Sequence, residues 1–294
     1  MREMNEPSGS RRECERAFAR IAEGLVHYRH VDGDAASRPT LMMHASPASS
    51  RSVEPLALAV AQIGGGRVIA PDTPGNGDSV PLRQNEPELL DYANAIVRTL
   101  DALAIKRVDI YGFHTGAHIG IELAIAHPDR VGSLALDGLL WLEESERADF
   151  LTQYAPPLVA DAWGTQIFQA LQFIRDQSWF FPHFKRDPAH NLGGGAMPPE
   201  LLHTLTVDLL KAASSYHLAY RAVFRHRLAE RLPKLTVPVL LMADDGDPTR
   251  ESVRRAATLV VDARTAIGGE GWSPDGVRRK ASRLVEFFGQ TAER

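Results

Sequence analysis

The stretch RVDIYGFHTGAHIGIELAIAHP, from Arg107 to Pro128, decides the fold. Its first residues, RVDIY, form a short apolar run that is typical of a buried strand, and the sequence from Thr115 onward predicts a helix that ends at the His-Pro pair. A sharp turn from a strand into a helix needs small flanking residues, and Gly112 and Gly116 provide them. The residue between them, His114, is therefore expected to project from the end of the strand.

Short apolar strands alternate with helices on both sides of this stretch. Strands are predicted over residues 24–31, 40–44, 67–72, 131–137, 237–244 and 258–263, and helices over residues 86–103, 249–257 and 277–288. Such alternation is typical of an α/β fold, in which helices cover both faces of a mostly parallel sheet.

One long segment interrupts the alternation. Residues 142–232 carry no strand pattern and are rich in aromatic and helix-forming residues, so they predict a helical lid inserted between two parts of an α/β core, residues 1–141 and 233–294. Residues 1–13 have no apolar core of a signal sequence and are expected to form a loose tail.

Charge and cysteine content narrow the classes of partner. The formal net charge is only −4 and the basic residues are scattered, which argues against nucleic acid or a membrane surface as a partner. A small-molecule substrate is expected instead. The single cysteine, Cys14, excludes an internal disulfide and suits the reducing cytoplasm, which is the predicted location. A homodimer is compatible with the sequence, and no cofactor is expected.

Four segments, in order along the chain, resemble landmarks of the α/β-hydrolase family. They are His44-Ala45-Ser46-Pro47, the run APDTPGNGDS at residues 70–79, the turn Gly112–Gly116, and Asp247-Pro248-Thr249. The resemblance covers the chain from Gly24 onward apart from the predicted lid, and it implies the α/β-hydrolase fold and a hydrolase activity. It also implies that the backbone N–H groups of Ser46 and Thr115 form an oxyanion hole.

The chain departs from the family at two positions of the catalytic triad. Its nucleophile elbow carries His114 where the family presents Ser, Cys or Asp, and no histidine follows His226 to act as the triad base. Gly271 or Glu270 stands at the vacated position. We expect His114 to fill the resulting hole and to pair with Asp247, which would orient the imidazole and make it more basic.

This pair predicts acid–base catalysis or direct attack by the imidazole, with Glu270 as a third candidate catalytic residue. Hydrolysis, C–C or C–O bond lysis, decarboxylation and isomerisation all fit. Plainer interpretations stay open: a silent ligand-binding protein, a helix N-cap for Asp247, and a solvated loop carboxylate for Glu270. His114 and His118 have a spacing seen in metal sites, but no third ligand is apparent nearby, so no metal site is predicted.

Six further residues are predicted to contact the substrate. Asp137 is a second candidate acid at the end of a strand, although its neighbour Gly138 also fits an ordinary turn. Arg175 is a candidate partner for a carboxylate, or a surface residue. His44 is expected mainly to support the oxyanion loop. The other candidates would wall an apolar pocket together with Phe180 and Phe181, or belong to the core of the lid: Trp141, Trp179 and Trp272.

Overall fold

The computed structural model of the protein describes residues 12–269 and 271–292. Within these residues, eight strands form one sheet in the order β1-β2-β4-β3-β5-β6-β7-β8. The strands are β1 (Glu15–Arg20), β2 (Leu25–Val31), β3 (Thr40–Met43), β4 (Val68–Pro71), β5 (Val108–Phe113), β6 (Val131–Asp137), β7 (Val239–Ala243) and β8 (Arg264–Ile267). β2 pairs antiparallel with β1 and β4, and the other pairs are parallel. The predicted α/β fold with a mostly parallel sheet is confirmed.

Helices lie between most of the strands. The α-helices are α1 (Glu54–Gln62), α2 (Leu89–Ala102), α3 (Thr115–Ala126), α4 (Glu144–Asp149), α5 (Thr165–Asp176), α6 (Pro199–Lys211), α7 (Tyr216–Arg225), α8 (Leu228–Arg231), α9 (Arg250–Ala257) and α10 (Pro274–Ala292). A π-helical turn, η3 (Phe150–Tyr154), directly follows α4.

The helices bury both faces of the sheet, because successive side chains of a strand point to opposite faces. In β3, Leu41 and Met43 belong to a core that includes residues of α2, α3 and α9. Met42 belongs to a second core, with residues of α1 and α10. The central strands are therefore buried on both sides, which explains why they read as continuous apolar runs.

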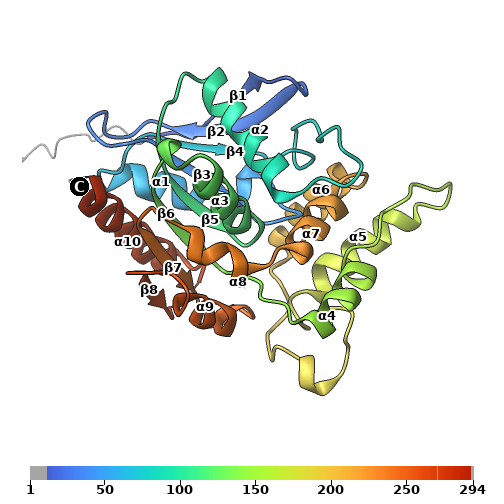
Figure 1. The fold of residues 1–294 in the computed structure, drawn as a ribbon. Coiled ribbons are helices and arrows are strands. Elements are labelled where there is room, and N and C mark those ends of the chain that lie inside the picture. Colours follow the sequence, from blue (N-terminus) through green and yellow to red (C-terminus); the bar gives the residue numbers. More distant parts are fainter. Residues whose placement is uncertain (1–11, 270, 293–294) are drawn as a thin grey trace, which may run out of the picture.

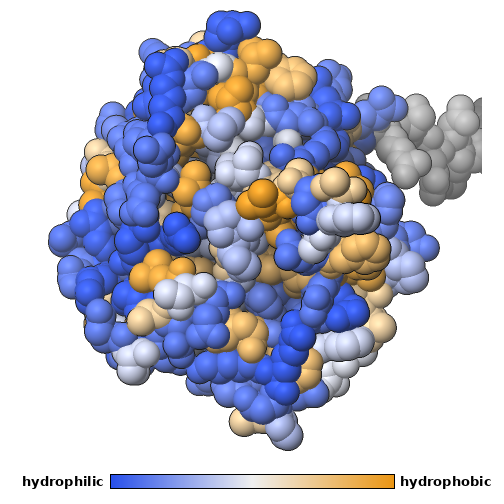
Figure 2. Space-filling view, turned by 90° about the vertical axis from the view of Figure 1, so that its right-hand side faces the viewer, coloured by the Kyte–Doolittle hydropathy of each residue, from blue (hydrophilic) through white to orange (hydrophobic). Residues whose placement is uncertain are grey.

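The chain between β6 and β7 folds into the helices α4 to α8, and we call residues 142–232 the helical insertion. Helices α4 to α7 gather beyond one end of the sheet, on the right of Figure 1. The face of the molecule formed on that side is largely hydrophilic, with separate hydrophobic patches (Figure 2). No helix of the described part of the chain is long and apolar enough to cross a membrane.

Two predictions at the edges of the sheet are wrong. Residues 258–263 do not form the last strand: they are a turn in which Asp262 has φ 54° and Val261 is 86% exposed. The edge strand is β8, which follows them. At the opposite edge, residues 15–20 form β1, although the sequence predicts no strand there.

Candidate active site

The turn between β5 and α3 consists of His114 alone. β5 ends at Phe113 and α3 begins at Thr115, and His114 between them has φ 46° and ψ −107°, a conformation that residues with a side chain rarely adopt. Its N–H donates to the carbonyl oxygen of Asp137 at 2.8 Å, and its own carbonyl accepts from the N–H of Ala117 at 2.9 Å. These bonds fix the backbone of the turn at the ends of β5 and β6.

Close packing explains why both flanks of the turn are glycine. A Cβ atom on Gly112 would lie 2.5 Å from the carbonyl oxygen of Gly116. A Cβ atom on Gly116 would lie 2.3 Å from the carbonyl oxygen of Met43, in β3. Any side chain at either position would push the start of α3 away from the sheet, so the elbow geometry depends on both glycines.

The imidazole of His114 contacts the carboxylate of Asp247, so the structure brings together the two residues that the sequence predicts to pair. Nε2 of His114 lies 3.1 Å from Oδ2 of Asp247. The other oxygen, Oδ1, accepts hydrogen bonds from the N–H and the hydroxyl of Thr249 at 2.7 and 2.6 Å. Because an ionised carboxylate only accepts, the close approach places a proton on Nε2 and leaves the lone pair on Nδ1. No described residue binds Nδ1.

Burial and charge act in opposite directions on this pair. Burial lowers the pKa of His114, but the charge and hydrogen bond of Asp247, with the charge of Asp137, outweigh it and raise that pKa above its usual value. Burial raises the pKa of Asp247, yet the contacts with His114 and Thr249 prevail and hold that pKa well below its usual range. Asp247 is thus ionised at neutral pH, and His114 is more basic than a free histidine.

Gly138, directly after β6, leaves room for the imidazole ring. A Cβ atom on Gly138 would lie 2.8 Å from Cε1 of His114 and 3.0 Å from each ring nitrogen. Gly138 also has φ 75°, which is unfavourable for residues that carry a Cβ atom. The ring therefore occupies the space that a side chain at position 138 would need.

Ser46 and Thr115 lie side by side at the predicted oxyanion hole, with a different set of donors from the one expected. The N–H of Ser46 donates to Oγ1 of Thr115 at 3.2 Å and is therefore engaged. The N–H of Thr115, at the start of α3, has no acceptor among the described residues. The hydroxyl of Ser46 is buried and has no partner within the same residues. The site thus offers the N–H of Thr115 as an unengaged donor, whereas the hydroxyl of Ser46 is enclosed by protein atoms.

A cavity of about 220 Å³ opens beside His114. The core and the helical insertion both contribute to its wall, which is formed by Ala45, Ser46, Phe113, His114, Thr115, His118, Leu140, Tyr154, Gln177, Phe181, Tyr220, Val223, Phe224, Pro248 and Thr249. The polar groups of the elbow and of the loop after β3 lie at one part of this wall, and aromatic rings of the insertion form another. The cavity can therefore enclose a small molecule with one polar group and an apolar body.

A buried lysine, which sequence reasoning missed, lies behind the elbow. Nζ of Lys280, in α10, donates to Asp137 at 2.5 Å and to Asp244 at 2.9 Å, and the hydroxyl of Tyr111 donates to the same oxygen of Asp137 at 2.6 Å. Nζ also lies 4.9 Å from the centre of the Trp272 ring. Burial lowers the pKa of Lys280, but the two carboxylates outweigh it and raise that pKa. No motif marks this residue within its helix.

His118 lines the cavity, but both of its ring nitrogens are engaged. Nε2 accepts from the N–H of Leu140 at 3.1 Å, and Nδ1 lies 2.8 Å from Nδ1 of His226. His226 in turn contacts Glu122 at 2.9 Å, and Glu122 pairs with Arg231. Burial lowers the pKa of His118 well below its usual value. The ring of His118 is therefore neutral, and because each of its nitrogens already has a partner, it links α3 to the insertion and is not available to a substrate.

The six residues that the sequence predicts to contact the substrate lie elsewhere in the structure. None of the six lines the cavity beside His114. His44 is fully buried, where Nε2 accepts from the N–H of Thr73 at 3.0 Å and Nδ1 donates to the carbonyl of Ala45 at 2.8 Å. Asp137 is equally buried, against Lys280. Both side chains are occupied in holding loops and strand ends together.

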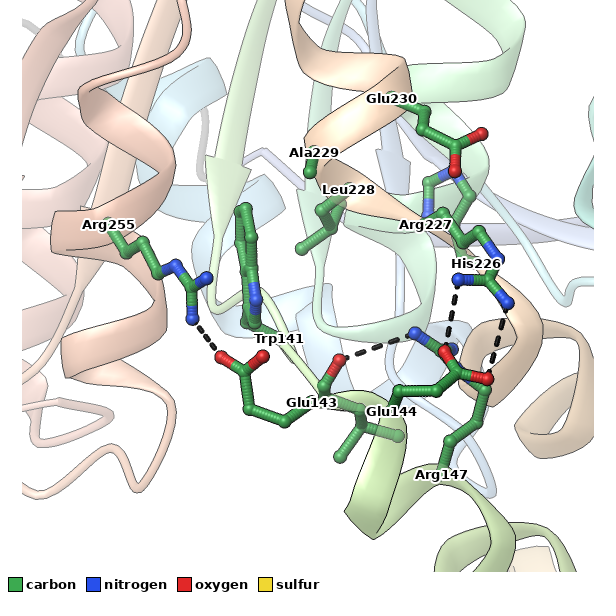
Figure 3. Close-up of a pocket in the computed structure, with 11 residues that line it drawn as sticks. Trp141, Glu143, Glu144, Arg147, His226, Arg227, Leu228, Ala229, Glu230 and Arg255 are labelled. Carbon is green, nitrogen blue, oxygen red and sulfur yellow. Dashed lines mark hydrogen bonds and ion pairs between the residues drawn. The ribbon is translucent and has the colours of Figure 1, made fainter.

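The remaining four residues are aromatic or basic and stack on one another or on charged groups away from the cavity. The ring of Trp272 lies over the buried lysine, as described above. Trp141 lines a separate pocket, where its ring stacks against Arg255 at 4.0 Å (Figure 3). Arg175 bonds to the neighbouring Asp176 and lies 5.3 Å from the centre of the Trp179 ring. The candidate Glu270 lies outside the described residues.

One cluster in the described part of the chain has the spacing of a metal site, and it is fully occupied by protein groups. It consists of His27, Asp72 and Asp78. Nδ1 of His27 lies 2.8 Å from Asp72, and Arg16 donates to Nε2 of His27 at 3.0 Å and to Asp78 at 3.1 Å. A guanidinium group in this position repels a cation, so the cluster is better explained as a structural ion-pair network.

Comparison with known proteins identifies the family of this chain. Residues 39–192, about half of the chain, match the family model of the alpha/beta hydrolase fold. The chain therefore belongs to the α/β-hydrolase fold family. Among solved structures, the enol-lactonase from Burkholderia xenovorans LB400 is similar with a TM-score of 0.68 and 18% identity, covering 93% of this chain and 100% of that one. This likeness shows the shared fold.

Curated relatives of the chain are hydrolases. The 2-hydroxy-6-oxononadienedioate/2-hydroxy-6-oxononatrienedioate hydrolase 2 of Pseudomonas putida is 35% identical over 148 residues, which are 46% of this chain and 47% of that protein. The putative carbamate hydrolase RutD of Caulobacter sp. (strain K31) is 26% identical over 238 residues, 74% of this chain and 87% of that protein. The chain spans about half the length of the first of these relatives.

Proposed function

We propose that this protein is a cofactor-free hydrolase of small carbonyl or ester-like substrates, with His114 as general base and Asp247 as its orienting carboxylate. The observation that carries the proposal is the 3.1 Å contact between Nε2 of His114 and Oδ2 of Asp247, at the wall of a cavity. The hydrolase relatives support the reaction class.

In the proposed reaction, Nδ1 of His114 takes a proton from water while the water oxygen bonds to the carbonyl carbon. The N–H of Thr115, at the start of α3, stabilises the resulting oxyanion. When the carbonyl re-forms, the bond to the leaving group breaks and the imidazolium returns its proton to that group. Asp247 keeps the proton on Nε2 and stabilises the imidazolium.

The rate enhancements expected from these groups are sufficient for a working enzyme. A positioned general base contributes about 10²–10⁴-fold to a rate, and one oxyanion donor about 10²–10³-fold. A serine acyl-enzyme route has less support, because the elbow carries no serine and no histidine follows His226. Bond lysis and isomerisation need the same base and donor, so they belong in any assay panel.

The relative from Pseudomonas putida does not supply the substrate directly. Its name specifies a dicarboxylate, and the carboxylates of such a molecule need cationic partners. Neither lysine nor arginine is found among the described residues that line the cavity.

The proposal is tested by turnover of esters, lactones, β-diketones and β-keto acids by wild type, His114→Ala and Asp247→Asn. We expect losses of at least about 10²-fold in both variants. A matched control is His190→Ala, which breaks a His-Asp pair of 2.8 Å with Asp187 outside the cavity and should leave rates unchanged. Full turnover in both site variants would end the catalytic role of the pair, and tight binding without turnover in wild type would indicate a ligand-binding protein.

A further inference from the structure

We infer that the cavity beside His114 selects uncharged carbonyl compounds with a small apolar or aromatic substituent and rejects those that carry a carboxylate. The inference rests on the proposed function in treating the bound molecule as a substrate. The selectivity for uncharged molecules is argued from the cavity itself.

The described residues that line the cavity include no formally charged side chain apart from a protonated His114. Among its fifteen described residues there is neither Lys, Arg, Asp nor Glu. At a pH where His114 is neutral, an ionised carboxylate that enters such a cavity loses its water and gains no cation from the described residues of the wall, which is strongly unfavourable. A neutral carbonyl group loses much less, because a hydrogen bond from the N–H of Thr115 replaces part of its water.

Most polar atoms of the wall are already bonded within the protein. The hydroxyl of Tyr220 donates to the carbonyl of Ser46 at 2.7 Å, and the hydroxyl of Tyr154 donates to Oε1 of Gln177 at 3.3 Å. Both nitrogens of His118 are engaged as well. The unengaged groups of the elbow are therefore Nδ1 of His114 and the N–H of Thr115, which belong to adjacent residues and form one spot. This spot fits a single carbonyl oxygen and its attacking water.

The charges behind the wall disfavour an anion further. Lys280 is the buried cation on this side, and it is shared between Asp137 and Asp244. Asp247 adds a third carboxylate next to His114. Lys280 is thus already paired with two carboxylates and is not available to an anionic ligand.

A separate pocket, shown in Figure 3, holds several further charged groups. There Arg227 bonds to Glu144 at 3.0 Å, Arg147 bonds to the same carboxylate at 3.3 Å, and Arg255 pairs with Glu143. These cations belong to a different pocket and are already paired with carboxylates.

The apolar part of the cavity determines which substituent the ligand can carry beside its carbonyl group. Its wall includes Phe181 and the stacked rings of Tyr220 and Phe224, whose centres are 5.7 Å apart. Such a surface favours an aromatic or compact aliphatic group. The volume of about 220 Å³ is below the range of about 300–1,000 Å³ that is usual for ligand pockets. The substituent must therefore be small.

The inference is tested by binding of matched ketones, which are not hydrolysed. Acetophenone is compared with 4-acetylbenzoate, and pentan-2-one with 4-oxopentanoate, by competition calorimetry at pH 8. We expect wild type to bind the neutral member of each pair with a Kd at least about tenfold lower. Equal or tighter binding of the carboxylates would overturn the inference, as would the absence of binding by either neutral ketone at millimolar concentration.

A second arm of the test introduces a positive charge into the wall of the cavity. Gln177 is half-buried at the cavity wall, and Gln177→Arg should improve binding of the carboxylates by about tenfold or more. Gln177→Met is the matched control, because it removes the same hydrogen bond to Tyr154 without adding charge. If the two variants bound the carboxylates with equal affinity, the absence of a cation from the wall would not be the cause of the selectivity, and the inference would be contradicted. Binding preference without any turnover would remove the proposed hydrolase and leave this inference intact, and turnover with equal affinity for the carboxylates would do the reverse.

Discussion

Replacement of Asp247 by asparagine changes one atom of the central pair and reverses its hydrogen bonding. Oδ1 of the new side chain can still accept from Thr249, as the carboxylate does. The amide NH2 would then face Nε2 of His114, and because this group only donates, Nε2 must present its lone pair and the ring proton must move to Nδ1. The atom that serves as the proposed base is lost without loss of side-chain volume.

The size of the effect follows from the 3.1 Å separation of the two groups. Opposite charges at this distance attract by about 5 kcal/mol at an effective dielectric constant of about 20. The side chain of His114 is 29% exposed, so solvent weakens the attraction, and we expect Asp247→Asn to lower the free energy of unfolding by about 2 kcal/mol near pH 6. For kcat/KM on an active substrate we expect a loss of about 10²–10⁴-fold.

The pH dependence of this stability loss has a definite sign. The pKa of His114 is raised in the folded protein, so the stabilisation by its charge is fully present below pH 6.5 and disappears as the pH rises through the raised pKa. Urea unfolding near pH 6 and near pH 9 should therefore show a larger deficit at the lower pH. Asp187→Asn is the control for an exposed His-Asp pair. A deficit that is equal at both pH values would refute the assignment of a charged His114–Asp247 pair.

Three further predictions concern charge. The rate kcat/KM should rise with pH along a limb whose midpoint lies above 6.5, because His114 must lose its proton to act as a base, and a midpoint below 6.5 in pH–rate profiles would contradict this. His118 has a strongly lowered pKa in the folded protein, so below pH 6.5 the unfolded chain binds more protons at this residue than the folded protein does. The free energy of unfolding should therefore fall by about 1.4 kcal/mol for each pH unit below 6.5. Urea unfolding of His118→Asn should lack this contribution to the pH dependence, and equal pH dependence in wild type and variant would exclude it. Lys280→Met should lower the unfolding free energy by about 3–5 kcal/mol, because two buried carboxylates lose their cation. Arg278→Met, on an exposed position of the same helix, should change it by less than about 1 kcal/mol, and similar losses in the two variants would show that burial of the charge is not the cause.

The fold and the central pair could be predicted because their signals are local in the sequence. The two glycines and His114 lie within five residues, and Asp247 lies in the short loop after a recognisable strand. Lys280 could not be found in this way, since its bond to Asp137 joins residues 143 positions apart and no motif announces it. The same holds for the contact between His118 and His226, which depends on how the insertion packs on α3.

The aromatic residues show a second limit of sequence reasoning. An aromatic side chain predicts burial or stacking, but not which cavity it faces, and the rings of Trp141 and Trp179 stack on the arginines Arg255 and Arg175 instead. The edge of the sheet shows a third limit. Residues 258–263 contain an apolar run, Leu259-Val260-Val261, yet form a turn. β8 has only exposed and half-buried positions and so lacks the apolar run of a central strand.

The side chains that fit at positions 114 and 138 depend on each other in size. Because the imidazole ring fills the space next to Gly138, a small elbow residue would leave a hollow there, and a larger residue at 138 would exclude the ring. Exchange between a histidine elbow and a serine elbow therefore involves at least two sites that are far apart in the sequence, besides the missing triad histidine. A serine at position 114 alone would therefore leave the space beside Gly138 unfilled, so the packing around this glycine favours the histidine.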